Sequence, residues 1–330
     1  MRRPILLTLS LVLLAGLEPS DVPAAPTREQ VDAVLSLPWN QLRTYAFDPS
    51  SPLDSRIRPC PKDLLRALRE MDGNRAYIAY APTAHDIELF RRYVTLLPPG
   101  IRRVLQTRLL RLCFVKNFMG SGFTSFVPGG DRGYVWMVLN SNLFQKSLSE
   151  TLTIRESSPF KGKPSVRVEA GEGYRGLLYG LLHEGTHAVD YTEGITPYTG
   201  ESIPVILHKE ELFASSWDVW MSYSKPRQDA DFPLRDKLRF FGLGGGPLLP
   251  ARDAPALFRG LAASPFPSAY AARSWAEDAA ELVTFFHLTQ VLNLPYVVTV
   301  GDGPKALRLE PMSSSRVLKR AERIYQRVKT

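Results

Sequence analysis

Two histidines and a glutamate on one short stretch, LLHEGTHAVD from Leu181 to Asp190, are the residues best suited to chemistry. His183 and His187 are four residues apart, and Glu184 follows the first histidine directly. On an α-helix, residues four apart project from the same face, so two imidazoles can bind one metal ion. Glu184 would lie about 100° around that helix, where its carboxylate could reach a metal-bound water instead of the metal. The spacing predicts a Zn²⁺ site with Glu184 as general base.

The residues around the two histidines predict a buried helix over Tyr174–Tyr191. The stretch is rich in leucine, and the two residues between Glu184 and the second histidine are uncharged. Gly185 costs ~1 kcal/mol of helix propensity without interrupting the pattern. Two imidazoles and a carboxylate are costly to bury without partners, so something must satisfy them. The alternative to a metal is a core helix with two hydrogen-bonded histidines.

Two histidines leave a catalytic zinc one protein ligand short. A third histidine at the HExxHxxGxxH spacing is absent, because Glu193 stands in its position and Asp190 replaces the glycine. Glu277 and Glu281 lie four residues apart within a strong helical pattern over Ser274–Leu292. One of them can bind the metal while the other orients an imidazole.

Glu277 also fits a second role, since Ser274 three residues before it completes a capping box. In that motif the Glu277 carboxylate would accept a hydrogen bond from the Ser274 amide. One carboxylate cannot fill both roles, so the sequence leaves ligand and cap as alternatives. On the same helix we expect Asp278 to be solvated and His287 to be a hydrogen-bonded core residue.

These two blocks together resemble the catalytic sites of gluzincin metallopeptidases, most closely the anthrax lethal factor type of catalytic domain. That family combines HExxHAVD, here His183 to Asp190, with ExxAE, here Glu277 to Glu281. A tyrosine stands seven residues before the glutamate ligand, and Tyr270 occupies this position.

The resemblance implies that Zn²⁺ is bound by the two histidines and Glu277. It further implies that Glu281 supports a histidine and that Tyr270 donates to the developing oxyanion. The separation of His187 and Glu277, 90 positions, is longer than in those relatives. A segment such as residues 209–250 must therefore loop away from the site.

The first 24 residues have the parts of a secretory signal. Arg2 and Arg3 precede an apolar stretch over Ile5–Leu17, and Val22 to Ala24 offers small residues for cleavage. About thirteen apolar residues are too few to cross ~30 Å of hydrocarbon. We expect a secreted or periplasmic protein that is not stably inserted in a membrane after cleavage.

The cysteines and the net charge bear on two questions, whether the protein contains a disulfide and which partners it binds. Cys60 and Cys113 are the only cysteines, and an oxidising compartment would permit one disulfide between them. The alternative is two separate buried thiols. The net charge of +8 is spread over scattered basic residues, which favours acidic partners in general and gives no reason to expect nucleic acid.

The order of predicted elements indicates an α+β fold. Residues 25–119 form an N-terminal region that is mainly helical, with predicted helices over 27–37, 61–71, 84–97 and 101–115. From Gly120 the pattern changes, and strands are predicted over 123–127, 134–139 and 165–170. A further helix is predicted over Lys209–Tyr223, a turn or flap at GLGGGP, and an amphipathic helix near the C-terminus. Residues 120–330 are expected to form a zincin-like domain with a small twisted sheet beside the active-site helix and a helical lower half.

The leading hypothesis is an exported zinc metallopeptidase whose substrate is a peptide or protein. The substrate would pair by β-addition with the strand in GYVWMVLN or the strand in SVRVEA, and the sequence does not choose between them. One alternative is a catalytically inactive, zinc-stabilised binding protein of the envelope or extracellular space. Another is a metal-free helical scaffold.

Overall fold

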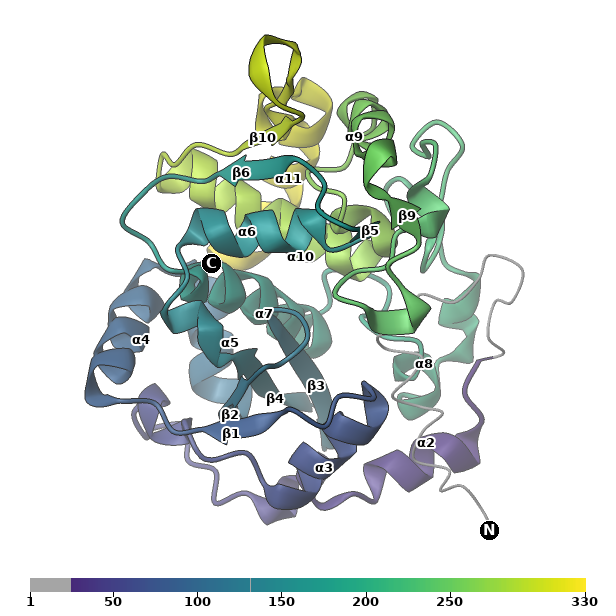
Figure 1. Cartoon of the computed structure of the whole chain (residues 1–330). Coiled ribbons are helices and arrows are strands. Elements are labelled where there is room, and N and C mark those ends of the chain that lie inside the picture. The colour runs from purple at the N-terminus through teal and green to yellow at the C-terminus, as the bar shows by residue number, and fades with distance from the viewer. Residues whose placement is uncertain (1–24, 131) are drawn as a thin grey trace.

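The computed structural model describes residues 25–130 and 132–330 (Figure 1). The predicted signal segment, 1–24, lies outside the described residues. Helices and small sheets are mixed along the chain, so the α+β prediction is confirmed. The described α-helices are α2 (Arg28–Leu35), α3 (Lys62–Met71), α4 (Ala84–Leu96), α5 (Pro99–Arg108), α6 (Leu148–Ser157), α7 (Gly176–Glu193), α8 (Ile203–Ile206), α9 (Ala254–Ala263), α10 (Trp275–Phe286) and α11 (Ser315–Lys329). The strands are β1 (Ile78–Tyr80), β2 (Leu109–Lys116), β3 (Gly122–Gly129), β4 (Arg132–Asn140), β5 (Phe160–Lys161), β6 (Val166–Glu169), β7 (Trp220–Ser222), β8 (Lys225–Pro226), β9 (Leu249–Pro250), β10 (Val297–Val300) and β11 (Leu307–Leu309).

The larger sheet has four strands in the order β1-β2-β4-β3. β2 and β4 run parallel in its centre, while β1 pairs antiparallel with β2 and β3 pairs antiparallel with β4. β3 is therefore an edge strand, and no other described strand pairs with its outer side. This edge matters for the site, because α7 packs against both β3 and β4.

Alternation along β4 shows how the sheet divides the core into two layers. Val135, Met137 and Leu139 join the main core with α4, α5 and α7. Trp136 and Val138 point to the opposite face, where α3 and its leucines cover the sheet. In Figure 1, α3 and α7 accordingly lie on opposite sides of the four strands.

The single helix predicted over residues 101–115 is wrong. α5 ends at Arg108, and the chain continues directly into β2. Because β2 is buried on both faces, it is a nearly continuous apolar run, in which a strand and a buried helix look alike. The boundary predicted between residues 119 and 120 thus falls between two strands of one sheet, and the N-terminal region contributes strands as well as helices.

Two further predictions concern the smaller sheet and the segment over residues 209–223. The strand predicted over 165–170 is β6, at the edge of an antiparallel sheet in the order β11-β10-β6. The helix predicted over Lys209–Tyr223 is wrong, since this segment forms a 3₁₀ turn at Glu210–Ala214 followed by β7. Its aromatic residues are held by tertiary contacts, and the buried Trp220 indole donates to Asp278 at 2.8 Å.

The predicted amphipathic helix near the C-terminus is α11, and its apolar face is buried. Val317, Ala321, Ile324 and Val328 are almost fully covered, and α11 packs against α10 and α5. Packing on the core, rather than binding to a membrane, thus explains this amphipathic pattern. Within residues 25–130 and 132–330, no helix combines the length and apolar character needed to cross a membrane.

Cys60 and Cys113 are free thiols in the structure, so the predicted disulfide is not formed. Both lie in the apolar layer between α3 and the sheet. A hydrogen bond between the thiols lowers the pKa of Cys60 and raises that of Cys113. Packing of this layer therefore brings the two sulfur atoms together without a covalent bond.

Candidate metal centre

The HExxH segment lies on α7, and glycines let this helix approach its neighbours closely. A Cβ on Gly185 would lie 2.5 Å from Ile101 of α5, and one on Gly180 would lie 2.7 Å from Leu143. Each glycine costs ~1 kcal/mol of helix propensity but permits this packing. Because α7 is enclosed by the sheet on one side and by α6 and α10 on the other (Figure 1), His183 and Glu184 are 3% and 4% exposed.

Glu277 reaches α7 from the first turn of α10, which packs across it. Ser274 is the N-cap of α10, and its hydroxyl accepts a hydrogen bond from the Glu277 backbone N–H at 3.3 Å. The reciprocal half of a capping box is missing from the described contacts of this helix, because the Glu277 carboxylate points to the histidines. The structure thus assigns the cap to Ser274 and leaves the Glu277 carboxylate for the cluster.

Three donor atoms converge on one point. His183 Nε2 lies 3.2 Å from His187 Nε2 and 3.1 Å from Glu277 Oε2. His187 Nε2 lies 3.5 Å from the same carboxylate oxygen. Ligand atoms of a tetrahedral zinc ion, with bonds of about 2.0–2.1 Å, are about 3.3 Å apart. In the described part of the chain, this is the one group of three His, Cys, Asp or Glu side chains arranged to hold a metal ion.

The charges around His183 favour a cation at this point. Burial lowers the pKa of His183, but hydrogen bonds with Glu277 and Glu281 outweigh burial and raise the pKa to about 10. Burial alone would raise the pKa of Glu277, yet the two histidines hold it well below its usual value. Two carboxylates facing one imidazole therefore stabilise positive charge, which is what a metal ligand set must do.

Glu281 holds the His183 ring from the side opposite the cluster. Its Oε1 lies 2.9 Å from His183 Nδ1 and accepts a hydrogen bond of 2.8 Å from the Tyr179 hydroxyl. Its Oε2 pairs with Arg155 at 2.6 Å and accepts a hydrogen bond of 2.6 Å from Ser268. The four contacts fix the carboxylate, and the carboxylate fixes the orientation of the imidazole.

Arg155 is a site residue that the sequence does not reveal. It lies on α6, is fully buried, and pairs with Glu156 at 2.7 Å as well as with Glu281. A buried guanidinium needs such anionic partners, because an uncompensated charge is costly in the interior. An Arg-Glu pair near a helix end ordinarily faces solvent, so no local pattern marks these two residues as part of a buried network.

Glu184 lies beside the cluster without belonging to it. Its Oε2 accepts a hydrogen bond of 2.7 Å from the Thr124 hydroxyl on β3, and a Cβ on Gly122 would lie 2.9 Å from its Oε1. Burial raises the pKa of this carboxyl, and the neighbouring histidines and Thr124 oppose the rise. A positioned carboxylate with a raised pKa next to a group of side chains that could hold a metal ion has the properties of a general base. Thr124, like Arg155, was not predicted, because its role depends on how the strand packs on α7.

Tyr270 places a hydroxyl at the same site. This hydroxyl lies 3.5 Å from Glu277 Oε1 and accepts a hydrogen bond of 3.3 Å from Arg273. The ring packs against Phe240, and its centroid lies 5.7 Å from that of His183. Burial raises the pKa of Tyr270 far above its usual value, so the hydroxyl remains a proton donor at neutral pH.

The other acidic residue singled out on α10, Asp278, is not solvated as predicted. Its side chain is fully buried and accepts a hydrogen bond from Trp220. It also forms an ion pair with Arg320 of α11. Asp278 therefore connects α10 to two other segments, which is a structural role on the side of α10 away from the cluster.

Three more residues named in the sequence analysis, Asp190, Glu193 and His287, have contacts of a structural kind. Asp190, which replaces the glycine of the longer histidine motif, accepts hydrogen bonds of 2.7 Å from the backbone N–H groups of Ile195 and Thr196. These bonds shape the turn that follows α7. Glu193 pairs with Arg103 on α5 at 2.5 Å. As expected, His287 is a hydrogen-bonded core residue, with partners Tyr325 and the Leu96 carbonyl at 2.7 Å each.

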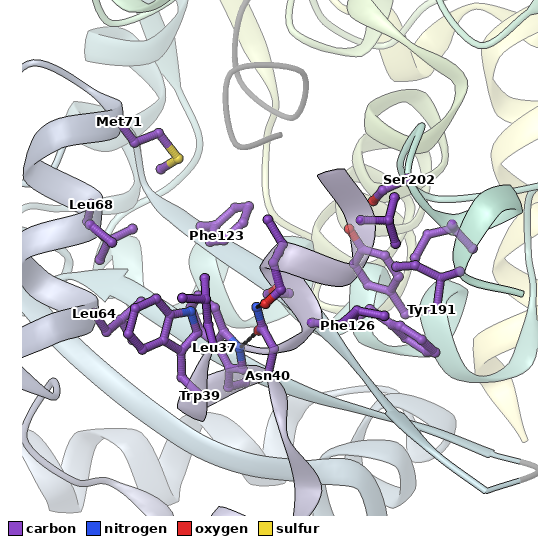
Figure 2. A pocket seen from close by; sticks show the side chains of 18 of the residues that line it. Leu37, Trp39, Asn40, Leu64, Leu68, Met71, Phe123, Phe126, Tyr191 and Ser202 are labelled. Carbon is purple, nitrogen blue, oxygen red and sulfur yellow. Dashed lines mark hydrogen bonds between the residues drawn. The ribbon is translucent and has the colours of Figure 1, made fainter. Parts of the chain in front are cut away.

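An apolar cavity of about 90 Å³ lies near the C-terminal end of α7 (Figure 2). It lies between α2, α3, the edge strand β3 and the C-terminal end of α7. One wall is formed by Phe126 and Tyr191, whose ring centroids are 5.9 Å apart. Tyr191 is one helical turn beyond His187, and Phe126 is two residues beyond Thr124. Figure 2 shows the wall on the side of α3, formed by Trp39, Leu64, Leu68 and Met71.

Comparison with known proteins found no matching family, no matching curated protein and no matching solved structure. The interpretation of the site therefore depends on its own geometry and on the motifs in the sequence.

Proposed function

We propose that this chain is a zinc-dependent peptidase of the gluzincin type. The observation that carries the proposal is the near-tetrahedral spacing of the His183, His187 and Glu277 donor atoms, with Glu184 beside them. Catalytic zinc sites use three protein ligands and leave a position for water, whereas structural sites fill all four. The described residues offer three. A location outside the cytoplasm remains a prediction from segment 1–24.

The residues of the site would divide the chemistry of amide hydrolysis among them. Bound zinc would lower the pKa of a water molecule and polarise the peptide carbonyl. Glu184 would accept the proton of that water and later deliver it to the leaving amine nitrogen. The Tyr270 hydroxyl would donate to the oxyanion, where fixed donors have their largest effect on rate. Glu281 would keep the His183 ring oriented.

We infer that an extended peptide substrate adds to the outer side of β3. An unpaired strand edge can take a further strand through backbone hydrogen bonds. Thr124 of β3 holds Glu184, so a peptide on this strand would pass the general base. The strand in GYVWMVLN is β4, which is paired on both sides. The strand in SVRVEA is β6, which belongs to the smaller sheet, so neither of the two strands suggested by the sequence suits this role as well.

The substitution Glu184→Gln tests the proposed chemistry. The amide keeps the size of the side chain and can still accept from Thr124, but it cannot take a proton. We expect the zinc-loaded variant to retain one equivalent of zinc and to hydrolyse a proteome-derived peptide library at least about 100-fold more slowly than the parent, given the usual contribution of general base catalysis. Zinc content is measured by mass spectrometry of the metal, and cleavage by peptide sequencing.

Glu193→Gln is the matched control, because it makes the same change on the same helix at a residue that pairs with Arg103. This variant should cleave like the parent, and a strong chelator should stop cleavage by both. A zinc-loaded Glu184→Gln protein that hydrolyses the library at the parental rate would contradict the proposal.

A further inference from the structure

A second cavity, of about 740 Å³, adjoins β3 at its N-terminal end, and its charged lining is entirely basic among the described residues. Its walls carry serine, threonine and asparagine side chains together with Lys146 and Lys163. Lys146 is half-buried and Lys163 is exposed. The nearby Glu150 is outside the lining, and its carboxylate is held by the Ser147 backbone N–H at 2.7 Å. Neither ammonium group forms an ion pair with a described residue.

This lysine cleft lies beside the segment that precedes β3, close to the candidate catalytic centre. Gly120 and Ser121 line it, and they directly precede Gly122, which touches the Glu184 side chain. Its other wall includes Phe241, which lies next to Gly120 and follows the Phe240 that packs on Tyr270. The cleft therefore lies beside the start of β3, near the Glu184 side chain, whereas the apolar cavity is lined by Phe123 and Phe126 farther along the strand.

The two cavities differ in chemical character, so different parts of a peptide bound along β3 would have different surroundings. The apolar cavity is lined by Phe126 and Tyr191. The lysine cleft, beside Gly120 and Ser121, offers two ammonium groups that form no ion pair with a described residue, although Lys146 is close enough to the Glu150 carboxylate to affect its charge. Ser121 and Thr124 are three positions apart, which is at most about 10 Å along an extended chain. A side chain two to four residues from the bond that is cut could therefore lie beside the lysine cleft.

We propose that the cleft around Lys146 and Lys163 binds an acidic side chain of the peptide substrate, on one side of the cleaved bond. This inference rests on the proposed peptidase function and names its substrate class. A carboxylate there would pair with the two ammonium groups in a partly enclosed cleft, whereas a lysine would be repelled. On the opposite side of the cleaved bond the apolar cavity gives no such preference.

The test uses peptides cut by the zinc-loaded full chain. Cleavage sites are found in a proteome-derived library, and matched peptides are then made with Glu, Gln or Lys at each of four positions on both sides. We expect Glu to raise kcat/KM over Gln by about fivefold at one or two positions on a single side, the size of a partly exposed ion pair. The preference should weaken at high salt, because salt screens such pairs.

The variants Lys146→Gln and Lys163→Gln should lose this preference for Glu over Gln. Lys161→Gln is the matched control, since Lys161 is exposed on β5, two residues from Lys163 and outside the lining. Cleavage without an acidic preference, or a preference that survives in both cleft variants, overturns the inference and leaves the peptidase proposal intact. Failure of the parent to cleave any library peptide overturns both.

Discussion

His183 is the central residue of the candidate metal centre, because both of its ring nitrogens face a carboxylate. Nε2 lies 3.1 Å from Glu277, and Nδ1 lies 2.9 Å from Glu281. The two acids have different surroundings: Glu281 is fixed by Arg155 and by two hydroxyl groups, whereas Glu277 has the histidines and a long contact with Tyr270. The geometry therefore favours Glu277 as the ligand and Glu281 as the residue that orients the ring.

Glu281→Gln tests this division of roles at the scale of single residues. The amide can still accept from His183 Nδ1, but it no longer supplies the charge that stabilises the imidazole as a ligand. We expect zinc affinity to fall by about 10- to 100-fold, the usual effect of removing such a supporting group. The dissociation constant is measured by competition with a chelating fluorophore.

The control for this prediction is Glu156→Gln, which alters the same buried Arg155 network without touching His183. Circular dichroism checks that both variants are folded. An equal loss of zinc affinity in the two folded variants would show that the network acts only through packing, contrary to the orienting role of Glu281.

At the scale of elements, periodicity predicted some segments well and others poorly. α7 and α10 carry patterns long enough to define a helix, and capping by Ser274 marks the start of α10. β2 was mistaken for the end of a helix because both of its faces are buried, which removes the alternation of a strand. The segment after α8 was mistaken for a helix, and its buried Trp220 is held instead by a hydrogen bond to Asp278 of α10, a tertiary contact that local patterns do not reveal.

The C-terminal end of α3 leads to a prediction about how the stability of the protein depends on pH. Asp72 is the C-cap of this helix and accepts a hydrogen bond from the Tyr77 hydroxyl. Burial raises the pKa of Asp72 to about 6, with the Tyr77 hydrogen bond opposing the rise. A negative charge at the C-terminal end of a helix is also unfavourable.

Asp72→Asn should therefore stabilise the protein at pH 8 and not at pH 4. In the unfolded chain the pKa of an aspartate is about 3.9. Between that pH and about 6 the folded state retains a proton that the unfolded state has lost. Stability due to Asp72 hence falls as pH rises through this window and is constant above it. We expect the free energy of unfolding to rise by on the order of 1 kcal/mol at pH 8. This is less than the full pKa shift of Asp72 would give, because the group is partly exposed.

Urea unfolding at the two pH values measures this difference in the free energy of unfolding. Asp63→Asn, on the exposed first turn of the same helix, is the control and should show no pH-dependent gain. A gain for Asp72→Asn that is as large at pH 4 as at pH 8 would contradict the assigned cause.

At the scale of the whole molecule, the site is assembled from segments far apart in the sequence. Thr124 comes from the edge strand β3, the histidines from α7, Arg155 from α6, and Glu277 from α10. The sequence identified the histidines and acids because their types and spacing are restrictive. It could not identify Thr124 or Arg155, because an ordinary threonine in a strand and an ordinary arginine on a helix become site residues only through packing. The α+β class was predictable from the order of elements. The division of the chain at residue 120 stays a prediction, although β2 and β3, on either side of it, belong to one sheet.

The position of zinc in a crystal of the full chain grown with one equivalent of zinc tests the central claim most directly. Anomalous diffraction at the zinc absorption edge locates the ion without assumptions about its ligands. We predict one peak, about 2.0–2.2 Å from Nε2 of His183, Nε2 of His187 and a Glu277 oxygen, with Glu184 outside the ligand set. A peak that excludes Glu277, or includes Glu184 as a ligand, or no peak between the two histidines, would contradict the account.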